Sequence, residues 1–312
     1  MERTRDLLAD ATRQLAGAGV PSPAVDAELL LAHVTGAPRG LLRLRGSDVD
    51  PGAAAQFRAL IAQRARRVPL QHLTGSAPFR HLELAVGPGV FIPRPETELI
   101  VDEVRRFAGG APGCVLVDLC TGSGALAISL ATELPGSSVT AVELAPEALV
   151  WAQRNVTAHA GQVAVAGSAL TLVCADATGA ALPGGPLAHL AGLVDVVVSN
   201  PPYVPDAAIP REPEVCEHDP AVALYGGTDG LDVVRALVEQ AALLLRPGGL
   251  LVVEHADVQG EDAGPGGLPG LLRAHRDPDE HDEAAWTDVS DHLDLSGRPR
   301  HTLAIRMGRM SP

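Results

Sequence analysis

The sequence contains no lysine, because all 24 of its lysine-or-arginine positions are arginines. This absence excludes a Schiff-base lysine, the phosphate-binding lysine of a Walker motif and a lysine general base. Aromatic residues make up only 3% of the chain, and no apolar run approaches the roughly 18 to 20 residues of a membrane-spanning helix. Residues 1–19 carry charges throughout and lack an apolar signal core, so we expect a mature helix there and no membrane partner.

Cysteine is also scarce, and its positions show neither metal-site nor disulfide spacing: Cys114, Cys120, Cys174 and Cys216. This pattern is typical of a reducing compartment, so we expect a cytoplasmic protein. The net charge is −14, and the acidic residues are dispersed along the chain. Because such a chain repels phosphate backbones, we expect no direct binding to nucleic acid. We also expect a monomer.

The chain is long enough for one large domain and one small domain. Residues 1–75 carry helical periodicity, and Pro51 begins one of the predicted helices. Residues 76–93 alternate between apolar and polar side chains and contain a Gly-Pro-Gly break, which predicts a β-hairpin linker. We therefore predict an N-terminal helical domain over 1–75, a linker over 76–93 and the main domain over 94–312.

From residue 114 onward, apolar strand patterns alternate with helical patterns. The predicted strands are 114–118, 138–143, 170–176, 194–200 and 250–255, and helical segments lie at 124–133, 146–159 and 231–245. Such alternation is typical of a parallel sheet with helices on both faces, so we predict a doubly wound α/β fold. Residues 301–307 predict a late edge strand. Residues 257–283, rich in glycine, proline and charge, predict a helix broken by loops.

Polar side chains recur at the carboxyl ends of four successive predicted strands: Asp118, Glu143, Asp176 and Asn200. Ligands of open parallel sheets bind just beyond these ends. A single carboxylate in this place is ordinarily a surface cap. Four polar strand ends in succession indicate a ligand site.

A glycine-containing loop, DLCTGSG, follows the first of these strands. Gly122 and Gly124 permit a tight turn and a close backbone approach before a helix N-terminus. Together with Ala127 they match the relaxed dinucleotide pattern Gly-x-Gly-x-x-Ala, but the Asp118 carboxylate would repel a pyrophosphate. S-adenosylmethionine fits the loop better, because it has no phosphate and carries an ammonium and a sulfonium group.

We predict that this cofactor contacts both the loop and the strand ends. Backbone contacts are expected from the loop. Glu143 is placed to accept both ribose hydroxyls, and Asp176 to accept the exocyclic amine of adenine. The predicted cofactor-binding residues are Asp118, Cys120, Thr121, Gly122, Ser123, Gly124, Glu143, Asp176 and Asn200.

The tetrad Asn200-Pro201-Pro202-Tyr203 ends the fourth strand. The lone pair of an amide or aromatic amine nitrogen is delocalised, so this nitrogen is a poor nucleophile. Asn200 Oδ1 and the Pro201 carbonyl are placed to accept its two N–H groups in one plane, which aims the lone pair at a methyl group. The prolines stiffen the turn, and Tyr203 offers a stacking face. We predict that these four residues are catalytic and act by positioning, without a metal.

Other interpretations of these motifs stay open at this point. The tetrad also fits a proline-rich turn in which Asn200 bonds its own backbone. A DNA or RNA base amino-N-methyltransferase uses the same tetrad, although the net charge of −14 disfavours it. A nicotinamide-dependent oxidoreductase would leave the tetrad unexplained, and a non-catalytic adaptor would have no need of Asn200 and Tyr203.

The chain resembles the PrmC/HemK family of N5-glutamine methyltransferases, which modify class 1 peptide chain release factors. The resemblance covers nearly the whole chain, in segments 72–79, 91–98, 118–131, 197–204, 219–231 and 245–255. The tetrad is shared with DNA adenine and RNA base N-methyltransferases. The motif PRPETE (93–98) after a small helical domain is much more specific.

This resemblance implies a Rossmann-like class I S-adenosylmethionine-dependent methyltransferase sheet behind a helical domain that contacts the release factor. It implies that the substrate is the glutamine of the Gly-Gly-Gln motif, held by the tetrad, and that PRPETE lies near the cleft. Two positions depart from the family pattern. Ala177 replaces an aromatic residue of some relatives, so adenine stacking is weaker or comes from elsewhere, and Cys120 replaces a common glycine with little expected effect.

Some further residues have two interpretations. Arg94, Glu96 and Glu98 fit either a lid or an ordinary helix start. Residues 275–283 contain histidines and carboxylates that fit a metal site, but a solvated charged loop suits them better. Two histidines beside predicted core segments are expected to be structural: His72 and His255.

Overall fold

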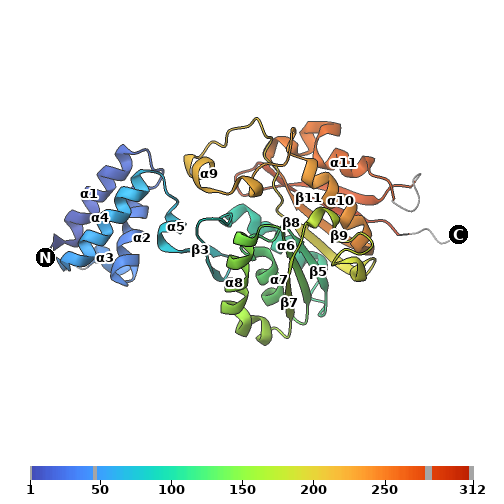
Figure 1. Ribbon diagram of the computed structural model, residues 1–312, viewed down its shortest axis with the longest axis horizontal. Helices are drawn as coiled ribbons and strands as arrows, with labels where there is room; N and C mark the ends of the chain where they lie inside the picture. Colours follow the sequence, from blue (N-terminus) through green and yellow to red (C-terminus); the bar gives the residue numbers. More distant parts are fainter. Residues whose placement is uncertain (1, 45–47, 278–282, 309–312) are drawn as a thin grey trace. The chain divides into compact units, whose positions relative to one another are not determined.

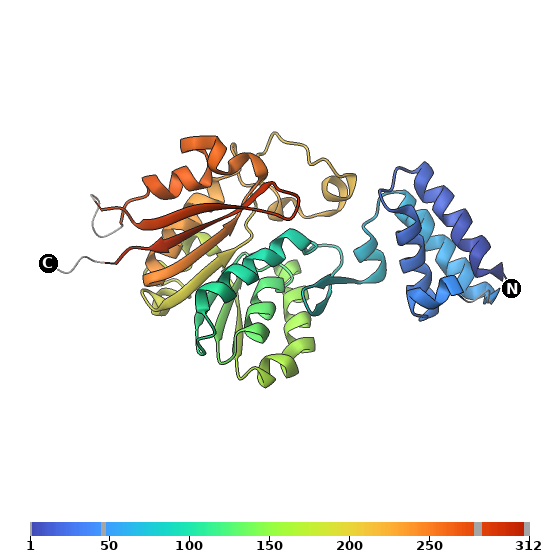
Figure 2. The ribbon, with the colours of Figure 1, turned by 180° about the vertical axis from the view of Figure 1, so that it is seen from behind.

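The computed structural model describes residues 2–44, 48–277 and 283–308 (Figures 1 and 2). The chain forms two compact units. The helical unit comprises Met1–Ser76, Val86–Pro88 and Pro210–Asp219, and the sheet unit comprises Ala77–Ala85, Gly89–Ile209 and Pro220–Pro312. Within the described ranges, none of the helices combines the length and the apolar character needed to cross a membrane.

The helical unit confirms the helical periodicity at the start of the chain. Its elements are α1 (Thr4–Gly17), α2 (Pro23–Thr35), α3 (Arg39–Leu44), α4 (Pro51–Ala65), α5 (Leu70–Thr74), α9 (Pro213–His218) and the short paired strands β1 (Glu2–Arg3) and β2 (Asp48–Val49). Asp50 caps α4 by accepting two backbone N–H groups, and Pro51 occupies the first helical position. The helices bury their apolar faces in one core, which includes Leu15, Leu31 and Phe57.

The segment that carries α9 joins this unit through buried ion pairs. Arg64 donates to Asp26 and to Glu214, in both cases at 2.7 Å, and Arg67 donates to the second oxygen of Glu214 at 2.5 Å. Burial opposes ionisation of Glu214, but the hydrogen bonds from both arginines lower its pKa to about 2. The charged form of Glu214 therefore anchors a segment that is about 150 residues distant in the sequence.

The sheet unit confirms the predicted doubly wound α/β fold. Its seven-stranded sheet has the order β10-β11-β9-β8-β5-β6-β7. The strands are β5 (Val115–Leu119), β6 (Ser138–Glu143), β7 (Ala169–Cys174), β8 (Val194–Ser199), β9 (Leu245–Glu254), β10 (Trp286–Leu293) and β11 (Pro299–Arg306). Strands β5 to β9 run parallel, and β11 pairs antiparallel with both β9 and β10.

Helices cover both faces of this sheet (Figures 1 and 2). One face packs against α6 (Glu98–Ala108), α7 (Ala125–Glu133) and α8 (Pro146–Val165), and the other against α10 (Asp232–Leu244) and α11 (Leu268–Ala274). In β8, Val197 belongs to the core with α10, whereas Val196 and Val198 belong to the core with α6 and α7. Burial on both faces explains why this strand is a run of valines.

Smaller elements connect these layers. They are the paired strands β3 (Ser76–Phe79) and β4 (Leu82–Ala85) and the 3-10 helices η1 (Pro95–Thr97), η2 (Ala177–Gly179), η3 (Ala188–Leu190), η4 (Ala221–Ala223), η5 (Asp257–Gln259) and η6 (Glu261–Gly266). Together with α11, η5 and η6 confirm a helix broken by loops. Residues 278–282 of that predicted stretch lie outside the described residues.

The prediction of an edge strand at 301–307 was wrong. This strand, β11, lies inside the sheet between β9 and β10, and β10 forms the edge. The sequence of β10, WTDVSDHL, is mostly polar, and its pairing shifts register between Thr287 and Ser290. A bulged polar edge strand carries little hydrophobic alternation, so the sequence pattern did not predict it.

Candidate active site

The carboxyl ends of the central strands meet at one edge of the sheet. Strand β5 lies between β6 and β8, and Leu119 is in register with both Val142 and Ser199. The chain order reverses between β5 and β8, and ligands of doubly wound sheets bind at such a point. All four polar strand-end residues lie at or within two residues of these ends: Asp118, Glu143, Asp176 and Asn200.

The glycine loop turns tightly between β5 and α7. Thr121 donates its backbone N–H to the Val142 carbonyl at 2.9 Å, and Gly122 donates to Glu143 Oε2 at 2.8 Å. Gly122 and Gly124 have φ values of +58° and +85°, and a Cβ on Gly124 would lie 3.2 Å from Ile128. The positive φ values favour glycine at both positions, and at Gly124 a side chain would also crowd Ile128.

Asp118 has an incomplete set of hydrogen bonds. Its carboxyl is fully buried; Oδ2 accepts the Thr121 hydroxyl at 2.5 Å, and Oδ1 has no hydrogen-bond partner among the described residues. Burial, with a smaller contribution from the nearby Glu143, raises the pKa of Asp118 to about 7, although the hydrogen bond from Thr121 opposes this rise. A cationic ligand group next to Oδ1 would satisfy this orphaned acceptor.

The other two carboxylates at this edge already take part in local structure. Glu143 is 9% exposed, and its second oxygen accepts the N–H of Ala145 at 2.8 Å. Each of its oxygens therefore holds one backbone N–H and keeps one lone pair for another donor. The exposed Asp176 uses Oδ1 to accept both the N–H and the hydroxyl of Thr178, at 2.8 and 2.6 Å.

Asn155 supports the glycine loop, although the sequence patterns did not single it out. From α8, its Nδ2 donates to the Ser123 carbonyl at 2.9 Å and to the Ala85 carbonyl at 3.0 Å. Its Oδ1 accepts the Ala85 N–H at 2.7 Å, and the residue is 1% exposed. The position of Asn155 inside a predicted helix gave no signal of this contact.

Two side chains from other elements, Thr97 of η1 and Glu254 of β9, connect the Asn200 and Tyr203 side chains of the tetrad. Asn200 donates Nδ2–H to Thr97 Oγ1 at 3.2 Å, and Thr97 donates its hydroxyl to Glu254 Oε2 at 2.6 Å. Tyr203 donates its hydroxyl to the other oxygen of Glu254 at 3.0 Å. Burial raises the pKa of Glu254, which is 1% exposed, while the hydrogen bond from Thr97 opposes this rise. Burial likewise raises the pKa of Tyr203.

The direction of these hydrogen bonds orients the Asn200 amide. While Glu254 is ionised, Thr97 gives it its single hydroxyl hydrogen, so the Thr97 oxygen only accepts from Asn200. Asn200 then turns Nδ2 toward Thr97 and keeps Oδ1 as an acceptor. Among the described residues, none donates to Asn200 Oδ1 or to the Pro201 carbonyl.

Close backbone packing stabilises the chain after the tetrad. Gln259 donates Nε2–H to the Tyr203 carbonyl at 3.0 Å. A Cβ on Gly226 would lie 2.4 Å from the Pro202 carbonyl oxygen, and one on Gly230 would lie 2.2 Å from the Tyr203 carbonyl oxygen. Only glycine fits at these two positions, so the backbone around Gly226 and Gly230 packs directly against the backbone of the tetrad.

The sequence was compared with protein families and with known proteins. Residues 6–75 match the model of the PrmC N-terminal domain, and residues 96–212 match the methyltransferase small domain. The "Release factor glutamine methyltransferase" of Streptomyces coelicolor is 47% identical over 95% of this chain and 96% of its own length. That of Mycolicibacterium smegmatis is 46% identical over 99% of this chain and 100% of its own length. The chain belongs to the release factor glutamine methyltransferase family.

Family membership confirms the resemblance drawn from the motifs. Among solved structures, the hMettl16 catalytic domain in complex with MAT2A 3'UTR hairpin 6 has a TM-score of 0.51 at 14% identity, over 83% of this chain and 82% of that chain. This likeness shows a shared methyltransferase fold. The chain thus contains a methyltransferase domain built on the doubly wound sheet.

Within this family member, the PRPETE motif contributes a residue that the sequence analysis did not select. In the sequence, Arg94, Glu96 and Glu98 of this motif fit either a lid or a helix start. In the structure, it is Thr97 that contacts Asn200. Arg94 lies over the Phe91 ring at 4.9 Å, and Glu98 accepts a backbone N–H at 2.9 Å. Glu254 ends β9, so the strand-end rule applied to a fifth strand would have found it.

Proposed function

We propose that this protein transfers a methyl group from S-adenosylmethionine to the side-chain amide nitrogen, N5, of the glutamine in the Gly-Gly-Gln motif of class 1 peptide chain release factors. Family membership over nearly the whole chain supports this function. The oriented Asn200 amide at the end of β8 is the structural observation that carries it. A base methyltransferase with the same tetrad is not favoured, because the relatives are named for glutamine of release factors.

The residues at the sheet edge fit S-adenosylmethionine. The orphaned Asp118 Oδ1 matches an ammonium group, and the open space beside Gly122 leaves room for a close backbone approach. The remaining lone pairs of Glu143 are available for ribose hydroxyls, and Asp176 Oδ2 for the adenine amine. The cofactor supplies an electrophilic methyl group. The proposed binding residues are Asp118, Cys120, Thr121, Gly122, Ser123, Gly124, Glu143, Asp176 and Asn200.

The tetrad acts as an amide clamp in this proposal. Asn200 Oδ1 and the Pro201 carbonyl accept the two N–H groups of the substrate amide in its plane, so that one face of the nitrogen lone pair points toward the methyl group. Tyr203 is fixed by Glu254 and stacks on the amide plane, while Pro202 stiffens the turn. The nitrogen gains the methyl group and then loses one proton, so no base has to act first. Positioning supplies most of the rate acceleration.

Thr97 and Glu254 act as positioning residues for this clamp. If Thr97 donated to Asn200 instead, the amide would turn Oδ1 inward and present N–H groups to the substrate. Two donors would then face each other, and the clamp would fail. Because Thr97 donates its single hydroxyl hydrogen to Glu254, that hydrogen is not available to Asn200, and this arrangement is prevented.

The remaining expectations belong to the same proposal. We propose that residues 1–75 contact the release factor, that the hairpin 76–93 links this domain to the methyltransferase domain, and that residues 94–312 perform the transfer. The substrate is then a cytoplasmic protein, and the enzyme acts on it as a monomer in the cytoplasm without direct binding to nucleic acid.

Methyl transfer from labelled S-adenosylmethionine distinguishes the substrates. The full chain is incubated with a class 1 release factor, with the same factor carrying alanine in place of the motif glutamine, and with duplex DNA or RNA. We expect label only on the unmodified release factor. Label on nucleic acid alone would refute the proposal, and label on neither, with cofactor still bound, would favour the adaptor interpretation.

A further inference from the structure

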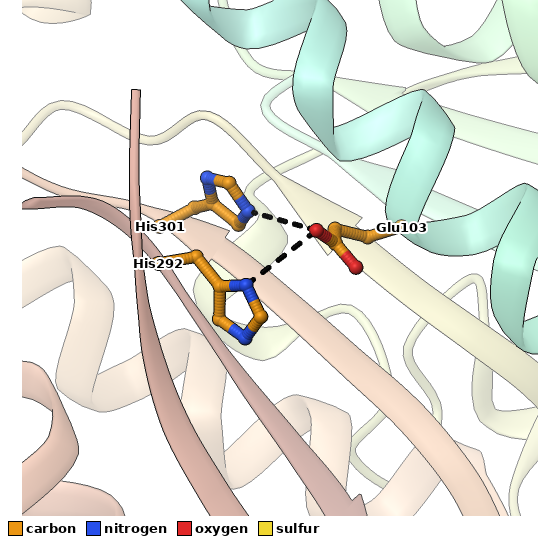
Figure 3. A group of neighbouring side chains, drawn as sticks. All are labelled: Glu103, His292 and His301. Atoms are coloured by element: carbon orange, nitrogen blue, oxygen red, sulfur yellow. Dashed lines mark ion pairs between the residues drawn. The ribbon is translucent and has the colours of Figure 1, made fainter. Parts of the chain in front are cut away.

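Three potential metal ligands converge on one face of the sheet (Figure 3). Glu103 comes from α6, His292 from β10 and His301 from β11. Glu103 Oε1 lies 3.5 Å from His292 Nδ1 and 3.8 Å from His301 Nε2, and one ligand atom from each residue lies within 4.8 Å of the others. Both imidazole rings thus direct a nitrogen toward the same carboxylate oxygen.

The pairing of β10 with β11 places the two histidines side by side. His292 and His301 are direct partners in the antiparallel register, so their side chains leave the sheet on the same face. Their rings stack with a centroid distance of 5.3 Å. Glu103, on a helix packed against this face, completes a set of two imidazoles and one carboxylate.

His301 is the most unusual member of this cluster. It is 1% exposed, and neither of its ring nitrogens has a hydrogen-bond partner among the described residues. Buried polar side chains in native proteins almost always have such a partner. A neutral imidazole ring keeps a lone pair on one of its two nitrogens. A bound cation would account for this unused lone pair.

The other two ligands have partners that orient them. His292 shares a 3.0 Å hydrogen bond between its Nε2 and Ser290 Oγ, which leaves Nδ1 for the centre of the cluster. Arg106 pairs with Glu103 Oε2 and leaves Oε1 for the same centre. Such outer contacts are typical of metal ligands. Arg106 and Arg300 add positive charge nearby, and Asp291 adds a compensating negative charge.

We propose that Glu103, His292 and His301 bind one divalent transition-metal ion, with Zn²⁺ as the best match. Two histidines and one carboxylate are an established zinc ligand set with one position left for water. Ligand bonds of about 2.0–2.2 Å in a tetrahedral site place ligand atoms about 3.4 Å apart. The observed 3.5 and 3.8 Å are close to this spacing, and all three ligand atoms lie within 4.8 Å of one another, so binding would draw them together.

The ion would connect α6 to the β10–β11 hairpin. Helix α6 begins directly after Thr97, and His301 is the register partner of Glu254 on β9. The metal would therefore brace the two elements next to those that carry the positioning residues, since Thr97 lies on η1 and Glu254 on β9. Binding of the ion does not depend on the proposed methyl transfer, and its test stands apart from that function.

Metal titration of the full, untagged chain tests this site. The protein is first treated with a chelator, and ZnCl₂ binding is then measured by calorimetry, while CoCl₂ binding is followed by its visible absorption. The variants are Glu103→Gln, His292→Asn and His301→Leu. The control is His189→Asn, an exposed histidine of the same unit. Circular dichroism verifies that each variant is folded, and the two partly exposed positions decide the outcome if His301→Leu does not fold.

We expect one Zn²⁺ per wild-type chain and a rise in melting temperature on binding. Glu103→Gln and His292→Asn should each weaken binding at least about tenfold. The control should bind like the wild type, and cobalt should give the strong visible bands of four-coordination. No saturable binding would overturn the proposal. So would unchanged affinity in either Glu103→Gln or His292→Asn, or equal weakening in the control.

Discussion

Replacing Asp118 by asparagine is expected to stabilise the sheet unit at pH 8 while weakening the binding of S-adenosylmethionine. The Asp118 carboxyl is fully buried, and one of its oxygens has no hydrogen-bond partner among the described residues. Burial raises its pKa from 3.8 to about 7, so its ionisation opposes folding. The difference between these pKa values, at 1.36 kcal/mol for each pKa unit, corresponds to about 4 kcal/mol.

The sign follows from which state holds the proton. The folded protein keeps a proton on Asp118 up to about pH 7, whereas the unfolded chain loses it near pH 3.8. This group's contribution to stability therefore falls as the pH rises from about 4 to about 7 and is constant above. Asparagine does not ionise and so removes this loss of stability. Its buried amide hydrogens lack a partner, however, and this costs about 1–3 kcal/mol of stability. We expect Asp118→Asn to raise the free energy of unfolding by about 1–3 kcal/mol at pH 8. At pH 5 the change caused by the substitution should be about 3 kcal/mol less favourable to folding.

Urea unfolding at pH 5 and pH 8 measures this difference. The two tryptophans, Trp151 and Trp286, both belong to the sheet unit, so their fluorescence reports on that unit. Thr121→Val is the matched opposite, because it removes the hydrogen bond that favours the Asp118 carboxylate. It should destabilise the protein at pH 8. Calorimetry should show at least tenfold weaker cofactor binding by Asp118→Asn. An equal change in unfolding free energy at both pH values would refute the reasoning.

Three further substitutions test the clamp and the helical unit. Asn200→Ala should raise the barrier by roughly 2.7–4 kcal/mol, by analogy with losing one oxyanion-hole donor, and near-normal single-turnover methylation would contradict the clamp. Thr97→Val should lower kcat roughly tenfold to hundredfold with a smaller change in KM, and Thr97→Ser should restore it; full activity of the valine variant would exclude the positioning role. Glu214→Gln should destabilise the helical unit by up to about 3 kcal/mol at neutral pH. Because the pKa of Glu214 is depressed to about 2, this effect is present above about pH 4.5 and is lost as the pH falls toward 2, which hydrogen exchange in α4 would reveal.

Much of the fold followed from local patterns in the chain. Val196, Val197 and Val198 are buried on both faces of a central strand, and such a strand leaves a continuous apolar run in the sequence. Strand β10 has no such apolar run in its sequence. Its side chains are mostly polar because it forms the edge of the sheet, and its place there depends on pairing with β11.

The candidate site divides in the same way. The sequence by itself determined the strand-end residues Asp118 and Asn200 and the glycine loop, because each depends on a short motif at the end of a local element. Only the tertiary structure decided how the Asn200 amide is turned, since Thr97 and Glu254 come from segments 103 and 54 positions away (200 − 97 and 254 − 200). The direction of a hydrogen bond depends on which groups are in contact in the folded chain. The spacing of residues along the sequence does not specify contacts between such distant segments.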